Sequence, residues 1–177
     1  MSLPGITPPF IPEGSTHSYH MYRIKFDPQK AGLDVHPGRF TKAIELAMGA
    51  EGLPLRLYQN IPIPGQILFK IKEGIGNGIP WTLPDTRKID YTIEDYPVTL
   101  NVLETTRCIG RSGTSGPNYF LNRQTIELYL QGFQKLWDHL PQLANSAKEI
   151  DYQVPWSNFA PSTRGVWTIF TPNSSNK

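Results

Sequence analysis

The sequence has only one cysteine, Cys108, among its 177 residues. A single thiol cannot form an intramolecular disulfide, so the sequence excludes the class of small secreted domains that disulfides hold together. We interpret Cys108 as a buried apolar side chain rather than a nucleophile. No run approaches the roughly 18 consecutive apolar residues of a membrane-spanning helix, and the N-terminus lacks the pattern of a signal peptide. These absences predict a cytoplasmic protein.

Charge is scarce as well. Charged residues make up 18% of the sequence, the net charge is +2, and acids and bases are mixed along the chain. A nucleic-acid-binding surface concentrates basic side chains to neutralise phosphates, and the sequence contains no such concentration. The low charge also argues against a disordered, self-repelling chain. We therefore expect one globular domain that binds neither nucleic acid nor a membrane.

Several familiar catalytic patterns are missing. No His, Cys or acidic residues have the spacing of a metal site, and no Gly-x-Ser-x-Gly turn suggests a serine nucleophile. The glycine-rich segment 110–116 matches neither the dinucleotide-binding pattern nor the P-loop, so we interpret it as a surface loop. Asp90, Glu94 and Asp95 lie beside a predicted helix start, where acidic residues are favoured, and do not need a role as paired glycosidase carboxylates.

Proline, in contrast, is abundant, with 17 residues, and predicts long ordered loops between short regular elements. The first predicted elements are a strand over 17–26, a helix that begins at Pro37 and ends before Gly52, and a strand over 53–57. An irregular loop over 58–68, a helix over 97–106 and a strand at 108–109 follow. The last element is a helix capped by Asn122, with an apolar stripe of Ile126, Leu130, Phe133, Trp137 and Leu140. This order indicates an α+β domain.

The predicted domain organisation has three parts. Residues 1–16 are rich in proline and glycine and form an extended lead-in. Residues 17–143 contain all the strongly patterned elements and form the domain itself. Residues 144–177 turn to Asn, Ser, Pro and Thr and are expected to be an irregular tail, with one possible strand over 166–170.

Five segments, taken in order, resemble one known domain. His17-Ser-Tyr-His20-Met-Tyr22 followed by Arg-Ile-Lys-Phe is similar to the strand that opens the C-terminal small domain of the DegT/DnrJ/StrS family of pyridoxal-phosphate-dependent (PLP-dependent) sugar aminotransferases. The remaining similar segments are the lead-in at 3–9, the helix and strand over 38–55, the loop Pro-Ile-Pro-Gly-Gln-Ile-Leu-Phe at 62–69, and the helix over 125–143.

The resemblance implies both a fold and an activity. The fold is the small C-terminal domain of the aspartate-aminotransferase-like (fold type I) PLP-transferase fold, a short and mainly antiparallel sheet with helices packed on one face. The activity moves an amino group from glutamate or glutamine to a keto sugar attached to a nucleotide. The resemblance also implies a large PLP-binding domain as partner, a homodimer in the full-length form, and a nucleotide-sugar substrate.

The chain departs from the family where the cofactor would be attached. The family's Schiff-base lysine lies upstream of the segments that match. The lysines Lys25, Lys42, Lys70, Lys72 and Lys88 have ordinary strand, helix or loop contexts, without the buried or cationic surroundings that activate an amine. We therefore expect no catalytic residue, no metal and no cofactor held by this chain alone, and we expect it to be inactive by itself.

The candidate substrate-binding residues are His20, Tyr22, Tyr58, Gln59 and Gln66. The resemblance implies that a histidine at the position of His20 faces the cofactor and the sugar, and imidazole can donate to a hydroxyl or phosphate. Each candidate has a structural alternative: a half-buried strand histidine for His20, a core aromatic for Tyr22, and a loop that only packs on the partner domain for the other three.

Two other functions stay open at this point. One is a stand-alone module that binds a nucleotide sugar or another carbohydrate, with tyrosine and tryptophan side chains as platforms. The other is a subunit that completes an enzyme together with a separately encoded large domain. If the chain does pack on a larger domain, an apolar patch should be exposed in its absence.

Overall fold

The computed structural model of the protein describes residues 3–18, 21–110 and 122–157. This part of the chain is a mixed α/β domain with one four-stranded antiparallel sheet and five α-helices. The elements in chain order are β1 (Ile6–Thr7), β2 (Arg23–Phe26), α1 (Pro37–Ala50), β3 (Leu55–Arg56), η1 (Ile63–Gly65), α2 (Ile67–Ile71), η2 (Ile93–Asp95), α3 (Pro97–Thr105), β4 (Thr106–Ile109), α4 (Arg123–Asp138) and α5 (Leu140–Glu149). None of these described helices is long and apolar enough to cross a membrane.

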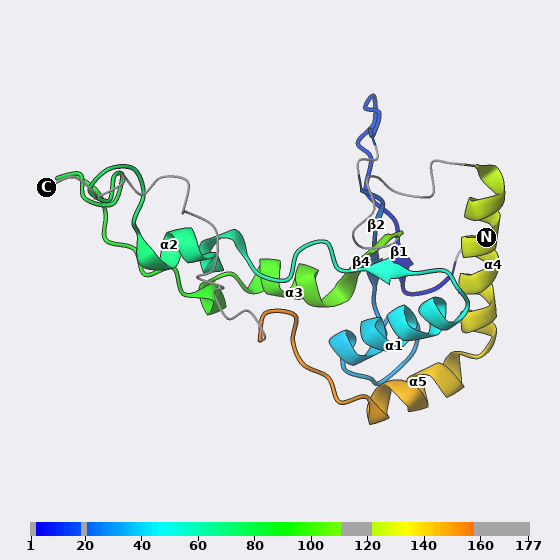
Figure 1. Cartoon of the computed structure of the whole chain (residues 1–177). Coiled ribbons are helices and arrows are strands. Elements are labelled where there is room, and N and C mark those ends of the chain that lie inside the picture. Colours follow the sequence, from blue (N-terminus) through cyan, green and yellow to red (C-terminus); the bar gives the residue numbers. More distant parts are fainter. Residues whose placement is uncertain (1–2, 19–20, 111–121, 158–177) are drawn as a thin grey trace, which may run out of the picture.

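The sheet has the strand order β1-β2-β4-β3 (Figure 1). Its centre is the pairing of β2 with β4, in which Ile24 lies opposite Arg107 and Arg23 lies opposite Cys108. On the far side of β4, Arg56 of β3 is also opposite Cys108. Because β1 and β3 have two residues each, the sheet is narrow and its edges are short, which limits pairing with other chains.

The sheet has two chemically different faces, because side chains alternate along a strand and directly paired residues project to the same side. One face, which we call the core face, carries Ile24, Phe26, Leu55, Arg107 and Ile109. The opposite face, which we call the arginine face, is defined by the strand residues Thr7, Arg23, Lys25, Arg56, Thr106 and Cys108.

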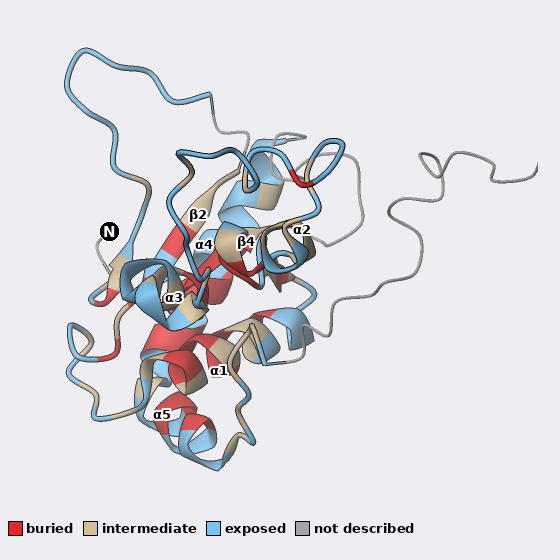
Figure 2. Ribbon diagram, turned by 90° about the vertical axis from the view of Figure 1, so that its left-hand side faces the viewer, coloured by how far each residue is buried: buried red, intermediate tan, exposed pale blue. Residues whose placement is uncertain are grey.

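Helices α1 and α4 cover the core face. The rings of Phe26 and Phe133 lie 6.0 Å apart, and those of Phe40 and Trp137 lie 6.2 Å apart. Phe40, Ile44 and Met48 of α1 are fully buried in this cluster. Helix α5 packs on α1 from the outside, so the buried residues gather among the sheet, α1 and α5 (Figure 2). Among the described residues, this cluster is the main hydrophobic core.

Local signals at the ends of two helices are confirmed. Pro37 occupies the first turn of α1, where its missing N–H is not needed. After that helix, Gly52 takes a φ of 76°, a left-handed conformation that favours glycine. Asn122 caps α4, and its Oδ1 accepts a hydrogen bond from the Thr125 backbone N–H at 2.8 Å. The predicted helix at 97–106 and the strand that follows it are also present, as α3 and β4.

The boundaries of other predicted elements are wrong. The strand expected over 17–26 extends only over Arg23–Phe26, and the strand expected over 53–57 has two residues. The partners explain this, since β2 can pair only along the four residues of β4 and the two of β1. The lead-in over 1–16 is not purely an extended linker, because it supplies β1.

The tail expected to be irregular from residue 144 begins inside a helix. Leu143, Ala144 and Ala147 of α5 are buried at helical spacing, and Pro141 lies in the first turn of that helix. Pro141 therefore starts α5, besides lying just beyond the end of α4. The possible strand at 166–170 lies outside the described residues, as does most of the glycine-rich segment 110–116.

Residues 57–96 form an arm that projects away from the helices and sheet (Figure 1). The predicted irregular loop at its beginning contains the short helices η1 and α2. Phe69, Trp81 and Tyr91 form a small aromatic cluster in the arm, in which the Trp81 indole N–H donates to the Tyr91 hydroxyl at 2.9 Å. The arm therefore has local packing of its own, separate from the main core.

Candidate functional site

The structure does not bring the five candidate residues into one site. Tyr22 lies on the side of the core face, next to Ile24 and α4. Tyr58 lies at the start of the arm, beside side chains of the arginine face. Gln59 and Gln66 are exposed on the arm, and the Gln66 side chain makes no capping bond at the start of α2. His20 lies outside the described residues.

Tyr22 lines an apolar cavity of about 450 Å³. The cavity lies between the N-terminal segment, the sheet and the first half of α4. Its lining residues are Leu3, Ile6, Pro8, Tyr22, Ile24, Ile109, Ile126, Tyr129, Leu130 and Phe133. The Tyr129 hydroxyl donates to the Pro54 carbonyl at 2.8 Å. With this lining, the cavity suits an apolar group better than a hydroxyl-rich sugar.

The first half of α4 is more exposed than its apolar stripe predicts. Phe133 and Trp137 are buried, whereas Ile126 and Leu130 are exposed. Leu128, which lies off the predicted stripe, is exposed as well. Ile126 and Leu130, one helical turn apart, also line the cavity and form an apolar surface at its mouth, of the kind that often marks contact with another domain or chain.

Two arginines form a row across the arginine face. Arg23 and Arg56 are both opposite Cys108, one from each side, so their side chains project from the same face of three adjacent strands. Their Cα atoms are separated by two inter-strand spacings, about 10 Å. Both guanidiniums lie near the Tyr58 ring, whose centre is 6.0 Å from Arg23 Cζ and 5.9 Å from Arg56 Cζ.

Neither arginine has an acidic partner within the part of the chain that the structure describes. Arg56 Nη2 contacts the Met21 sulfur at 3.1 Å, which is a weak acceptor. The Nε of Arg56 is buried and finds no hydrogen-bond acceptor there. An unsatisfied buried donor costs about 1–3 kcal/mol. The fold itself therefore leaves guanidinium hydrogen-bonding capacity unused at this site.

The tyrosine ring does not compensate for the missing acceptor. A cation–π contact at an exposed position contributes about 0.5–1 kcal/mol and satisfies no N–H donor. Two nearby guanidiniums also repel each other, and Lys25 adds a third positive charge to the same face. The unsatisfied donor and the repulsion among positive charges therefore destabilise the isolated chain, and the positive charges favour binding of an anion.

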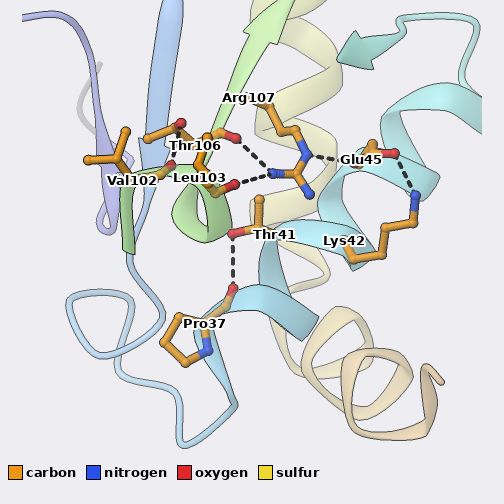
Figure 3. A network of polar contacts seen from close by, with 8 residues as sticks. All are labelled: Pro37, Thr41, Lys42, Glu45, Val102, Leu103, Thr106 and Arg107. Atoms are coloured by element: carbon orange, nitrogen blue, oxygen red, sulfur yellow. Dashed lines mark hydrogen bonds and ion pairs between the residues drawn. The ribbon is translucent and has the colours of Figure 1, made fainter. Parts of the chain in front are cut away.

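Arg107, on the core face, is in the opposite situation. It is only 3% exposed, and its Nε donates to Glu45 Oε2 of α1 at 2.6 Å (Figure 3). Its Nη1 donates to the Thr106 carbonyl at 2.7 Å. Lys42 donates to the other Glu45 oxygen, also at 2.6 Å. This network joins β4 to α1 and has a structural role.

The charge of Glu45 is fixed by this network. Burial favours the protonated carboxyl, but the hydrogen bonds from Lys42 and Arg107 outweigh it and hold the pKa of Glu45 below its usual range. Glu45 is therefore ionised at neutral pH, which matches the permanent charge of Arg107.

A second polar cluster holds the segment after α5 in place. The Tyr152 side chain lies against Gly38 of α1 and next to Glu104 of α3. Burial, followed by the negative charge of Glu104, raises the pKa of Tyr152 far above its usual range, so the side chain remains a neutral phenol. The ring of His36 lies 5.5 Å from that of Tyr152. These contacts tie the C-terminal segment to two helices.

The described residues do not fit covalent attachment of a PLP cofactor. No lysine in the described ranges is buried. Lys42 is paired with Glu45, and Lys70 donates to the Tyr91 carbonyl at 2.5 Å. Within the same ranges, no three His, Cys, Asp or Glu side chains gather into a set that could hold a metal ion. Within the described ranges, the site that the geometry supports is the arginine face with Tyr58.

The arginines were missed by sequence reasoning. Arg23 and Arg56 are separated by more than thirty residues, and only the pairing of both strands with β4 brings them together. Tyr58 was selected, but for its place in the loop and not for a contact with arginine. The sequence matches no protein-family model, and no curated protein matches it either.

Proposed function

We propose that this chain is the C-terminal small domain of a PLP-dependent nucleotide-sugar aminotransferase of the DegT/DnrJ/StrS type. In this proposal the domain shapes one wall of the active site, and another domain holds the cofactor. Pyridoxal phosphate supplies the electron sink for amino transfer when it is bound. Because the lysines described above do not fit its attachment, the chain is inactive alone.

The observation that carries the proposal is the asymmetry of the sheet. Helices α1 and α4 pack on the core face, while the arginine face presents charged and aromatic side chains next to a long arm. The strand, helix, strand, arm and closing helix correspond to the similar segments, whereas α3 and β4 belong to none of them. These features agree with the small domain of a fold type I enzyme.

Two surfaces have roles in the proposal. Tyr58, Gln59 and Gln66 on the arm are exposed and can bond hydroxyls of the sugar. The exposed apolar residues Ile126 and Leu130, one turn apart at the start of α4, would pack on the large domain.

The test compares the chain alone with the chain supplied with a large domain, either fused upstream or co-expressed. Each preparation is mixed with pyridoxal phosphate, reduced with borohydride, and weighed by intact-mass spectrometry. We expect no stoichiometric lysine adduct on the chain alone, and amino transfer from glutamate or glutamine to a nucleotide keto sugar by the combined protein. A stoichiometric adduct on one lysine of the chain alone would contradict the proposal.

Substitutions test the arm directly in the combined protein. Tyr58→Phe and Gln66→Ala should raise the KM for the nucleotide sugar several-fold and leave the amino donor's KM unchanged. Gln142→Ala, at an exposed position in α5, is the matched control. If the chain alone bound intact nucleotide sugars with micromolar affinity and no large domain restored activity, the stand-alone binding module would be the correct function.

A further inference from the structure

We propose that Arg23 and Arg56, with the Tyr58 ring near both guanidiniums, form a binding site for phosphate groups. The inference depends on the geometry of the arginine face and not on the proposed function, so either can fail without the other. The ligand chemistry is that of a phosphate-bearing small molecule.

The sheet fixes the positions of the two cations. Both arginines are fixed by strand pairing to the same residue, Cys108, so their separation does not depend on a flexible loop. Both guanidiniums then approach the same tyrosine ring, at 6.0 and 5.9 Å. The rigid sheet thus holds two planar guanidinium groups near one point. A guanidinium can donate two parallel hydrogen bonds to two oxygens of a phosphate.

The described chain leaves part of the hydrogen-bonding capacity of these arginines unused. The buried Nε of Arg56 has no acceptor among the described residues, and its Nη2 is directed at a thioether. Arg107 shows what this fold does with a structural arginine, because there a carboxylate and two carbonyls accept from it. A ligand bound to the exposed part of the two guanidiniums would supply acceptors that the described chain does not.

The arginine face is accessible to a solute. Tyr58 is 46% exposed, and Arg23 and Arg56 are both partly exposed, so a solute can reach the guanidiniums. Lys25 lies on the same face, two residues beyond Arg23, and adds attraction for an anion. A phosphate dianion or a diphosphate fits this concentration of positive charge better than a neutral sugar or a single carboxylate.

The experiment measures binding of three probes to the whole chain by isothermal titration calorimetry at low salt: inorganic phosphate, pyrophosphate and uridine 5′-diphosphate. We expect saturable binding of pyrophosphate. Arg23→Met and Arg56→Met should each weaken it ten-fold or more, and the double variant should abolish it. Arg56→Lys keeps the charge but loses the fork, and should weaken binding several-fold. Tyr58→Ala should weaken it less than either Met variant.

Arg123→Met is the matched control. This arginine is 92% exposed and already paired with Glu127 at 2.8 Å, so its loss should change binding less than two-fold. Circular dichroism of each variant verifies that the fold is retained. Tighter binding of uridine 5′-diphosphate than of pyrophosphate supports the site and assigns a nucleotide as the source of the phosphate, whereas equal binding supports it for the phosphate alone.

Two outcomes would overturn the inference. The first is that none of the three probes binds to the folded wild-type chain. The second is that the double variant, still folded, binds pyrophosphate as well as the wild type. Neither of these results bears on whether a large domain restores amino transfer.

Discussion

Three arginines project from the strands of this small sheet, and its two faces treat them differently. Arg107, on the core face, is 3% exposed and bonded to Glu45 and to backbone carbonyls. Arg23 and Arg56, on the arginine face, are partly exposed, have no carboxylate partner in the described chain, and share one tyrosine ring. All three arginines belong to the same sheet, so the difference arises from what packs on each of its faces.

Arg107 is therefore a cation that holds the fold together, whereas Arg23 and Arg56 are not. A buried arginine must be paired, because an isolated charge in a low-dielectric interior is very unfavourable. A partly exposed arginine can remain unpaired at a modest cost, and natural proteins accept such costs at binding sites. The free energy of unfolding should therefore respond strongly to changes at Glu45 and Arg107 and weakly to changes at Arg23 and Arg56.

The largest expected effect follows from removing the acidic partner of Arg107. Glu45→Gln keeps the side chain's shape but leaves a buried guanidinium without its counter-charge, and should lower the free energy of unfolding by about 3 kcal/mol. Glu51→Gln is the control, because Glu51 and Lys135 form a pair of similar length, 2.7 Å, in a more exposed place. Its effect should be at most about 1 kcal/mol. Urea unfolding measures both, and equal effects would contradict the comparison.

A somewhat smaller effect is expected where α1 meets Tyr152. A Cβ added to Gly38 would overlap the Tyr152 hydroxyl and the Glu104 carboxylate, so Gly38→Ala should cost about 2 kcal/mol. Gly49→Ala, in the same helix with open space around it, should instead stabilise by about 0.5–1 kcal/mol. Adding Tyr152→Ala to Gly38→Ala should cost less than the sum of the two single changes. If the two changes in unfolding free energy were additive, the overlap caused by Gly38→Ala would be relieved by groups other than Tyr152.

These examples also indicate what the sequence alone could reveal. Asn122 and Pro37 act through neighbouring backbone groups, so the starts of α4 and α1 were predicted correctly, whereas α4 ends at Asp138 and the predicted helix residue Leu140 begins α5. The row of Arg23, Cys108 and Arg56 depends on the pairing of strands far apart in the chain, and no local pattern specifies that register. Helix α5 was missed because Pro141 was interpreted only as the end of the preceding helix.

The candidate site was predicted only in part. Tyr58 was chosen from its loop, and it does lie beside the arginine face. Tyr22 and Tyr58 were grouped as substrate contacts, but they lie on opposite sides of the sheet. Period-two alternation gives the relative faces of Tyr22 and Arg23, but it cannot tell which face the helices will cover.

The change of the unfolding free energy with pH is expected to be a smaller effect. The pKa of Glu45 is held below its usual range in the folded chain, so its pairing stabilises the fold above the ordinary carboxylate pKa of about 4.3 and is lost as pH falls through the lower, folded value. The difference in unfolding free energy between wild type and Glu45→Gln should therefore narrow between pH 6 and pH 3. A constant difference over this range would show that the charge of Glu45 is not what stabilises the fold.

The smallest stability effect is expected on the arginine face. Arg56→Met removes a charge that no described carboxylate balances, while the methionine side chain keeps much of the apolar contact of the arginine stem. The free energy of unfolding should stay within about 0.5 kcal/mol of wild type or increase, because repulsion from Arg23 and an unsatisfied buried donor are both removed. Arg107→Met, measured in the same urea titration, should be strongly destabilising, since it leaves Glu45 with only Lys42. If Arg56→Met destabilised the chain as much as Arg107→Met, Arg56 would be a structural residue, and the contrast between the two faces of the sheet would be lost.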